Sequence, residues 1–149
     1  MAYDRMDWHY GAEDFPSDLM PENGGTHIGM FLAWAINNNL EGEIHRDESQ
    51  ESLKKLRSRK ITGREFLEQE CDEKFWEDDL NEEGNEFAKY YYDSDKYIED
   101  YDNTLGDESP SLYYVQDTWI NYDKLAPIIS MRHQKWKRRK NRKWWQVWK

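Results

Sequence analysis

The chain has 149 residues, of which 37% are hydrophobic and 35% are charged, and its net charge at pH 7 is -10. This length fits one domain, and the 8 Trp, 10 Tyr and 5 Phe residues exclude a fully disordered chain, because disordered chains contain few aromatic residues. The single cysteine, Cys71, excludes an intrachain disulfide framework. Because the N-terminus also lacks an apolar leader, we expect a cytoplasmic protein.

The predicted elements begin with an irregular N-terminal arm over residues 1–25, where glycines and prolines interrupt every period. A helix is expected to follow, with Thr26 as its N-cap and the apolar residues between 28 and 36 on one face. Asparagines at 37–39 are suited to its C-terminal end, because Asn tolerates the left-handed conformation.

Several shorter helices are expected in the middle of the chain. Residues 49–57 carry inward leucines at helical spacing. Thr62 and Glu65 have the spacing of a capping box, which predicts a helix from there to about Trp76. Aromatic anchors at helical spacing extend the prediction to residues 81–92 and 95–101.

The last predicted helix begins at Ser109 and Pro110, an N-cap followed by proline in the first turn. Pro127 is expected to kink this helix or to mark a restart, since its ring clashes one turn back. Together these elements predict a mainly α fold, a compact single-domain helical bundle with an irregular N-terminal arm. Residues 111–122 also favour strands, so an α+β fold with a small sheet is the alternative.

Charge divides the chain into an acidic helical domain, residues 1–136, and a basic tryptophan-rich tail, residues 137–149. Nine Lys or Arg residues and no acidic residue follow position 131, whereas residues 1–131 carry a net charge of -19. Residues 65–108 alone carry -15. Such a surface repels nucleic acid and attracts basic partners.

The sequence contains no local pattern of catalytic or metal-binding residues. Its four histidines form no zinc motif, and Cys71 lies among carboxylates that disfavour a reactive thiolate. We therefore expect no enzyme activity, no metal and no cofactor. The alternative is an enzyme or ligand-binding site that forms if the arm folds over the first helix and brings together Trp8, His9, Tyr10 and His27.

Two segments are candidate binding surfaces. The first is acidic and rich in tyrosine, which suits an interface with a basic partner protein; its candidate residues are Asp93, Asp95, Tyr97, Glu99, Asp100 and Tyr101. The alternative is that these tyrosines belong to the core and the acidic residues face solvent.

The second segment is the tail, where basic residues alternate with tryptophans that can contact nucleic acid or an anionic membrane. Its candidate residues are Trp136, Arg138, Arg139, Trp144, Trp145 and Trp148. The alternative for the tail is that it docks on the protein's own acidic body or on that of a second copy.

Four blocks of sequence, WHYG at 8–11, THIGMFLAW at 26–34, DLNEEGN at 79–85 and DTW at 117–119, resemble a bacterial domain family of unknown function. The resemblance runs over roughly residues 3–137. Members of this family are similar to small acidic proteins that accompany antibacterial toxins as immunity proteins. The resemblance therefore implies a protein-binding module that neutralises a bacterial toxin by covering its basic surface or active site.

Overall fold

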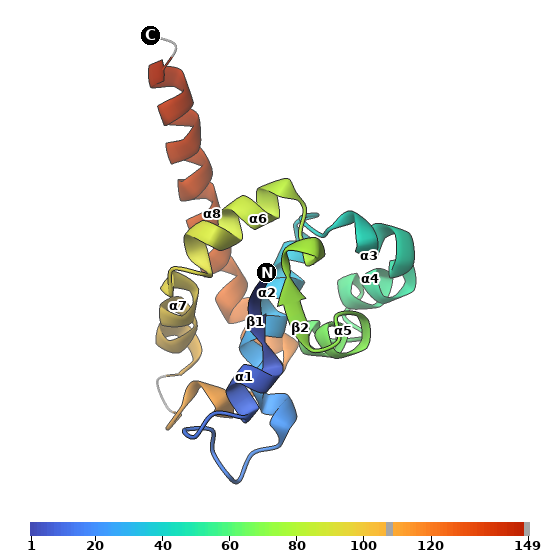
Figure 1. The fold of residues 1–149 in the computed structure, drawn as a ribbon. Coiled ribbons are helices and arrows are strands. Elements are labelled where there is room, and N and C mark those ends of the chain that lie inside the picture. The colour runs from blue at the N-terminus through green and yellow to red at the C-terminus, as the bar shows by residue number, and fades with distance from the viewer. Residues whose placement is uncertain (107–108, 148–149) are drawn as a thin grey trace.

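The computed structural model describes residues 1–106 and 109–147, and for residues 142–147 the backbone alone. The fold is mainly helical with a small two-stranded antiparallel sheet (Figure 1), which confirms the predicted fold class. The elements in chain order are β1 (Ala2–Arg5), α1 (Met6–Tyr10), η1 (Pro21–Gly25), α2 (Thr26–Asn37), α3 (Glu43–Glu48), α4 (Gln50–Arg57), α5 (Gly63–Glu70), β2 (Lys74–Trp76), η2 (Glu77–Asp79), α6 (Glu82–Tyr91), α7 (Lys96–Leu105), η3 (Leu112–Tyr114) and α8 (Trp119–Val147).

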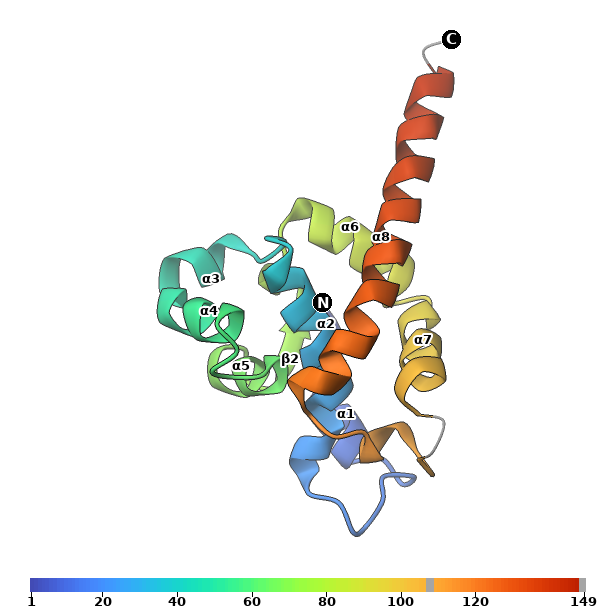
Figure 2. The ribbon, with the colours of Figure 1, turned by 180° about the vertical axis from the view of Figure 1, so that it is seen from behind.

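Helix α2 forms the centre of the molecule, and the other helices lie around it in both views (Figure 1, Figure 2). It is buried on every side from Thr26 to Ile36, so the prediction of one apolar face is too narrow. Thr26 is also not the N-cap, because Gly25 occupies that position and the Thr26 hydroxyl is buried without a partner among the described residues. Asn39 has a φ of 59°, which confirms the predicted helix end.

A close contact between two glycines sets the crossing of α2 and α5. A Cβ atom on Gly63 would lie 1.8 Å from the carbonyl oxygen of Gly29, and a Cβ on Gly29 would lie 2.2 Å from the backbone nitrogen of Arg64. Only glycine permits the two backbones to approach this closely. This crossing brings Phe66 and Leu67 into the core beside α2.

The small sheet pairs the N-terminal arm with a strand far along the chain. Strand β1 lies antiparallel to β2, with Asp4 opposite Phe75 and Arg5 opposite Lys74. The prediction of a wholly irregular arm is therefore wrong for residues 2–10. The Tyr3 ring packs on Phe75 at a centroid distance of 5.0 Å and anchors the arm to the core.

The middle of the chain confirms most of the predicted helices and corrects one end. The capping box of Thr62 and Glu65 is present at the start of α5, and the Asn81 side chain caps α6. The helix from Thr62 does not reach Trp76, because α5 ends at Glu70 and β2 follows. Helix α3 was not predicted.

The segment after α7 differs from the sequence prediction. Helix α8 begins at Trp119 instead of Ser109, and the Thr118 hydroxyl accepts a hydrogen bond from the backbone of Asn121 at 3.2 Å. The helix then continues through Pro127 without a restart. Pro127 is exposed, so the carbonyl group freed one turn earlier lies on the solvent side of the helix.

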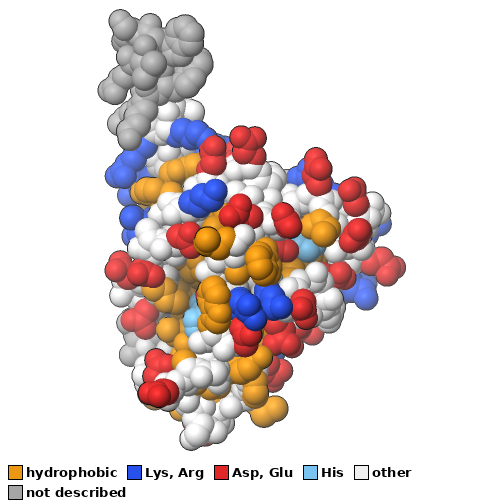
Figure 3. Space-filling model, viewed as in Figure 1, with side chains coloured by type: hydrophobic (Ala, Val, Ile, Leu, Met, Phe, Trp, Pro, Cys, Tyr) orange, Lys and Arg blue, Asp and Glu red, His pale blue; other side chains and the backbone are white. Residues whose placement is uncertain are grey.

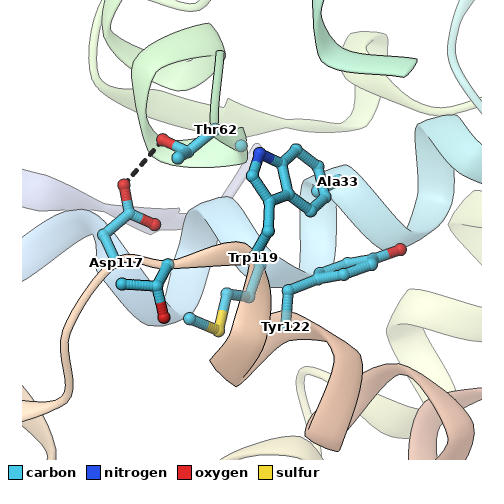
Figure 4. A pocket seen from close by; sticks show the side chains of 8 residues that line it. Ala33, Thr62, Asp117, Trp119 and Tyr122 are labelled. Carbon is cyan, nitrogen blue, oxygen red and sulfur yellow. Dashed lines mark hydrogen bonds between the residues drawn. The ribbon is translucent and has the colours of Figure 1, made fainter. Parts of the chain in front are cut away.

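A hydrogen bond from Thr62 to Asp117, 2.6 Å long, ties the start of α8 to α5 (Figure 4). Trp119 and Tyr122 lie on the other side of the hollow seen there, which encloses about 10 Å³. That volume holds at most one water molecule, so this hollow belongs to the packing between the two helices.

Candidate functional site

The acidic, tyrosine-rich segment is divided between the core and the surface. Tyr97 and Tyr101 are fully buried, and Asp100 accepts hydrogen bonds from Tyr91 and Arg132 inside the protein. These three residues cannot contact a partner from the surface, so their assignment to an interface is corrected. Their helical spacing on α7 turns them toward α8 and α2, whereas Asp93, Asp95 and Glu99 are exposed.

His9 and His27 come together as the alternative hypothesis required. Their rings lie 4.4 Å apart between centroids, edge to face, and both bond to Asp4, which the sequence analysis did not single out. His9 Nε2 lies 2.7 Å from Asp4 Oδ1, and His27 Nε2 lies 3.2 Å from Asp4 Oδ2. The hydroxyl of Tyr92 donates to the same carboxylate at 2.6 Å.

These contacts fix the charge of the cluster. Burial favours the neutral form of Asp4, but the hydrogen bonds from His27 and His9 outweigh it and hold the pKa of Asp4 below its usual range. The pKa of His27 lies below its ordinary value, because burial outweighs its bond to Asp4. The cluster therefore contains an ionised carboxylate, Asp4, beside a neutral histidine, His27.

Two of the exposed acids, Asp93 and Asp95, share one cleft of about 210 Å³ with the histidine cluster. Asp93 and Asp95 line it together with Asp4, His9 and His27, and the tyrosine rings at positions 3, 92 and 97 complete its walls. Two groups of residues that the sequence analysis treated as separate sites therefore meet here. Carboxylates beside aromatic faces are suited to a cationic group.

Trp8 and Tyr10 do not share this cleft. They lie on α1 with exposed fractions of 54% and 37%, and the Arg5 guanidinium lies 5.8 Å from the centroid of the Trp8 ring. The predicted ligand site is therefore reduced to His9 and His27. Asp4 and Tyr113, whose hydroxyl bonds His9 Nδ1 at 2.7 Å, were missed because they are brought there only by tertiary folding.

A second group of side chains that could bind a metal lies close to β2, with Cys71 before the strand and Asp79 after it. His45, Cys71 and Asp79 are all buried, and their ligand atoms lie within 4.8 Å of one another. Burial raises the pKa of the Cys71 thiol, and Asp79 raises it further. This agrees with the predicted unreactive thiol. The sequence analysis missed the grouping because the three residues come from three segments.

The chain contacts the body at the start of the tail and then extends away from it. The Trp136 ring packs on Phe87 at 5.5 Å between centroids, and Lys140 contacts Glu86. Beyond these contacts, the described backbone of α8 extends away from the rest of the molecule (Figure 1). Arg138 is exposed, and Arg139 bonds the hydroxyl of Tyr90 at 3.4 Å. The predicted side chains Trp144, Trp145 and Trp148 lie outside the described residues.

Residues 2–115 match the family model described as a domain of unknown function, DUF7832, and the chain belongs to that family. The match ends before α8, so the resemblance expected to about residue 137 is shorter than predicted. No curated protein and no solved structure matches the chain. None of the helices in the described part of the chain is long and apolar enough to cross a membrane.

Proposed function

We propose that this member of the family is a protein-binding module that holds a basic side chain of its partner in the cleft between the arm and the start of α7. The observation that carries the proposal is the composition of that cleft. Asp93 and Asp95 are exposed at positions where an incoming cation meets them, and the ionised Asp4 lies among the lining residues.

The cleft suits the side chain of an arginine or lysine. A guanidinium group can bond two carboxylate oxygens at once, and charge-assisted bonds of this kind are roughly twice as strong as neutral ones. The rings of Tyr3 and Tyr92 offer aromatic walls against which a guanidinium or ammonium group packs favourably.

The charge around the cleft would steer such a partner. Residues 65–108 carry a net charge of -15, and acidic side chains are spread over the face that contains β1 and β2 (Figure 3). Basic side chains gather along the described part of α8 instead. Complementary fields of this kind raise association rates by roughly 10-fold to 1000-fold.

Within this class, the most specific proposal is an immunity protein that neutralises a bacterial toxin. A toxin that acts on nucleic acid carries a basic active-site surface, and an acidic protein that covers this surface would prevent substrate binding. The small acidic body and the acidic cleft support this proposal, whereas the family match itself carries no function.

The test uses two triple variants of the full chain that lose the same charge. Asp93→Asn and Asp95→Asn change the cleft, and Glu99→Gln changes an exposed acid on the following helix, α7. The control, Glu43→Gln, Asp47→Asn and Glu51→Gln, changes exposed acids on α3 and α4. A tagged wild-type protein captures its partner from a bacterial lysate, and association with the purified partner is then measured for all three proteins.

We expect the cleft variant to associate at least about tenfold more slowly than the control variant, with a weaker dependence on salt. Equal rates for the two variants would place the interface elsewhere. The immunity proposal is tested separately, by expressing the captured partner in bacteria with and without this protein. Unchanged growth inhibition in the presence of this protein would rule out neutralisation.

The projecting end of α8 supports a second candidate function, association with nucleic acid or an anionic membrane. Residues 132–149 contain nine basic and no acidic side chains. Beyond Lys140, the described backbone of α8 extends away from the acidic body (Figure 1). Binding of this kind falls steeply with salt. It should vanish when residues 137–149 are removed, and binding that survives the removal would refute this role for the tail.

A further inference from the structure

His45, Cys71 and Asp79 converge on one point from three separate segments. His45 lies on α3, Cys71 directly follows α5, and Asp79 ends η2. His45 Nε2 lies 2.8 Å from Asp79 Oδ1 and 3.8 Å from Cys71 Sγ. Their exposed fractions are 2%, 9% and 6%, so each of the three residues is almost fully buried.

The orientation of the imidazole ring distinguishes a metal site from a catalytic triad. In a cysteine-nucleophile triad, the thiol and the carboxylate contact opposite nitrogens of the histidine. Here both Cys71 and Asp79 face Nε2 of His45, whereas Nδ1 faces the Ser49 hydroxyl at 3.2 Å. Three ligand atoms that face a common point are the arrangement that a metal ion requires.

Two of the three ligands, His45 and Asp79, are oriented by further contacts. Ser49, which faces His45 Nδ1, donates to Glu70 at 3.1 Å, and this chain of contacts leaves Nε2 toward the cluster. The second oxygen of Asp79 accepts the backbone N–H of Trp76 at 2.7 Å, which directs the first oxygen inward. Hydrogen bonds that orient ligands in this way are typical of metal sites.

The spacing of the ligand atoms suits a tetrahedral ion. Ligands at zinc distances of about 2.0–2.3 Å lie roughly 3.3–3.6 Å apart in a tetrahedron. The distance of 3.8 Å from His45 to Cys71 is close to this value, and the 2.8 Å from His45 to Asp79 would widen by about half an ångström when an ion enters.

The surroundings give an ion both access and attraction. The three residues line a cleft of about 430 Å³, whose walls also carry Glu48, Glu70, Asp72 and Asp78. Together these carboxylates lower the free energy of a cation near the cluster. Since the ligands themselves face the cleft, the fourth coordination position is open to water from this side.

We propose that His45, Cys71 and Asp79 bind one zinc ion that links α3, the end of α5 and η2. Sulfur, imidazole nitrogen and carboxylate oxygen are the ligand types that zinc takes in proteins. A thiolate and a carboxylate together neutralise the two positive charges of the ion. When zinc binds, the Cys71 thiol releases its proton to solvent and the sulfur forms the bond to zinc.

The experiment compares the full-length wild-type protein with Cys71→Ser, His45→Gln and the control His9→Gln, which removes a histidine from the other cluster. Each protein is stripped with a chelator and checked for folding by circular dichroism. It is then titrated with Zn²⁺ and, separately, with Co²⁺, whose spectrum reports both tetrahedral geometry and a thiolate bond.

We expect wild type and His9→Gln to bind one equivalent of zinc and to show the thiolate-to-cobalt band. Cys71→Ser should lose that band, and both it and His45→Gln should bind zinc at least about 100-fold more weakly, because even supporting contacts are worth 10-fold to 100-fold. The proposal is overturned if wild type binds no zinc, if its cobalt spectrum lacks the thiolate band, or if His9→Gln loses the metal while Cys71→Ser retains it.

Discussion

Replacing Asp4 with Asn tests whether the buried carboxylate holds the N-terminal arm in place. Its two oxygens accept four hydrogen bonds, from His9 at 2.7 Å, His27 at 3.2 Å, Tyr92 at 2.6 Å and the backbone N–H of Arg5 at 2.8 Å. An Asn side chain keeps one oxygen and presents an NH₂ group in place of the other.

The loss of folding free energy depends on which of the two Asp4 oxygens is replaced by the NH₂ group. If the new NH₂ group faces His27, that ring must move its proton to Nδ1 to accept the bond. Nδ1 is buried without a partner among the described residues, so an unpaired N–H results. An orphaned buried donor costs about 1–3 kcal/mol, and the lost charge-assisted bonds add a similar amount.

We therefore expect Asp4→Asn to lower the free energy of unfolding by about 3 kcal/mol at pH 7. Urea unfolding followed by circular dichroism measures this difference. Asp7→Asn is the matched control, because Asp7 lies on the same arm but pairs with Arg5 near the surface. If both variants unfold at the same urea concentration, the Asp4 network does not stabilise the arm and the reasoning is wrong.

Three further predictions follow from the same structure. Because the pKa of His27 is depressed in the folded state, the unfolded chain takes up a proton first as the pH falls from 7.5 to 5.5. Stability should therefore decrease over this range, by up to about 1.4 kcal/mol per pH unit, and His27→Gln should flatten the profile of urea midpoints. Removal of residues 137–149 should leave a folded protein with an unchanged helical core by circular dichroism, because the described contacts there are surface ion pairs worth about 0–1 kcal/mol each. Gly63→Ala should destabilise the protein by at least about 3 kcal/mol in thermal unfolding, because its Cβ would overlap Gly29, whereas Gly24→Ala, with a nearest contact of 3.2 Å, should cost less.

The parts of the fold that were predicted correctly depend on local chemistry. The capping box needs only Thr62 and Glu65, and the left-handed helix end needs only an asparagine at position 39. Both signals are complete within a few residues. Tertiary contacts can strengthen them but do not change which residues take part.

The errors arise where distant contacts override local preference. Helical spacing from Phe66 through Cys71 to Phe75 extended the predicted helix to Trp76. In the structure, Asp72 and Glu73 take φ values of 52° and 61°, which end the helix and turn the chain into β2. Neither residue is a glycine, so this turn has no strong signal in the sequence.

The start of α8 was missed for a different reason. Ser109 and Pro110 form a good local start signal, but Thr118 also has the side chain of an N-cap. The body holds Asp117 through its bond with Thr62, and the next residue, Thr118, then caps the helix through its bond from Asn121. A sequence can present several acceptable helix starts, and the tertiary contact selects one of them.

The convergence of His9 and His27 was anticipated, but Asp4 and the whole of the second cluster were missed because both depend on the unpredicted sheet. Strand β1 carries Asp4, and its pairing with β2 places that carboxylate beside His27 on α2. Strand β2 lies between Cys71 and Asp79, and the backbone of Trp76 at its end orients the Asp79 carboxylate. One short pair of strands therefore organises both the acidic cleft and the proposed zinc site, although it is among the smallest elements of the fold. A change that separates β1 from β2 would act on both sites at once, whereas changes within either cluster would act on that cluster alone.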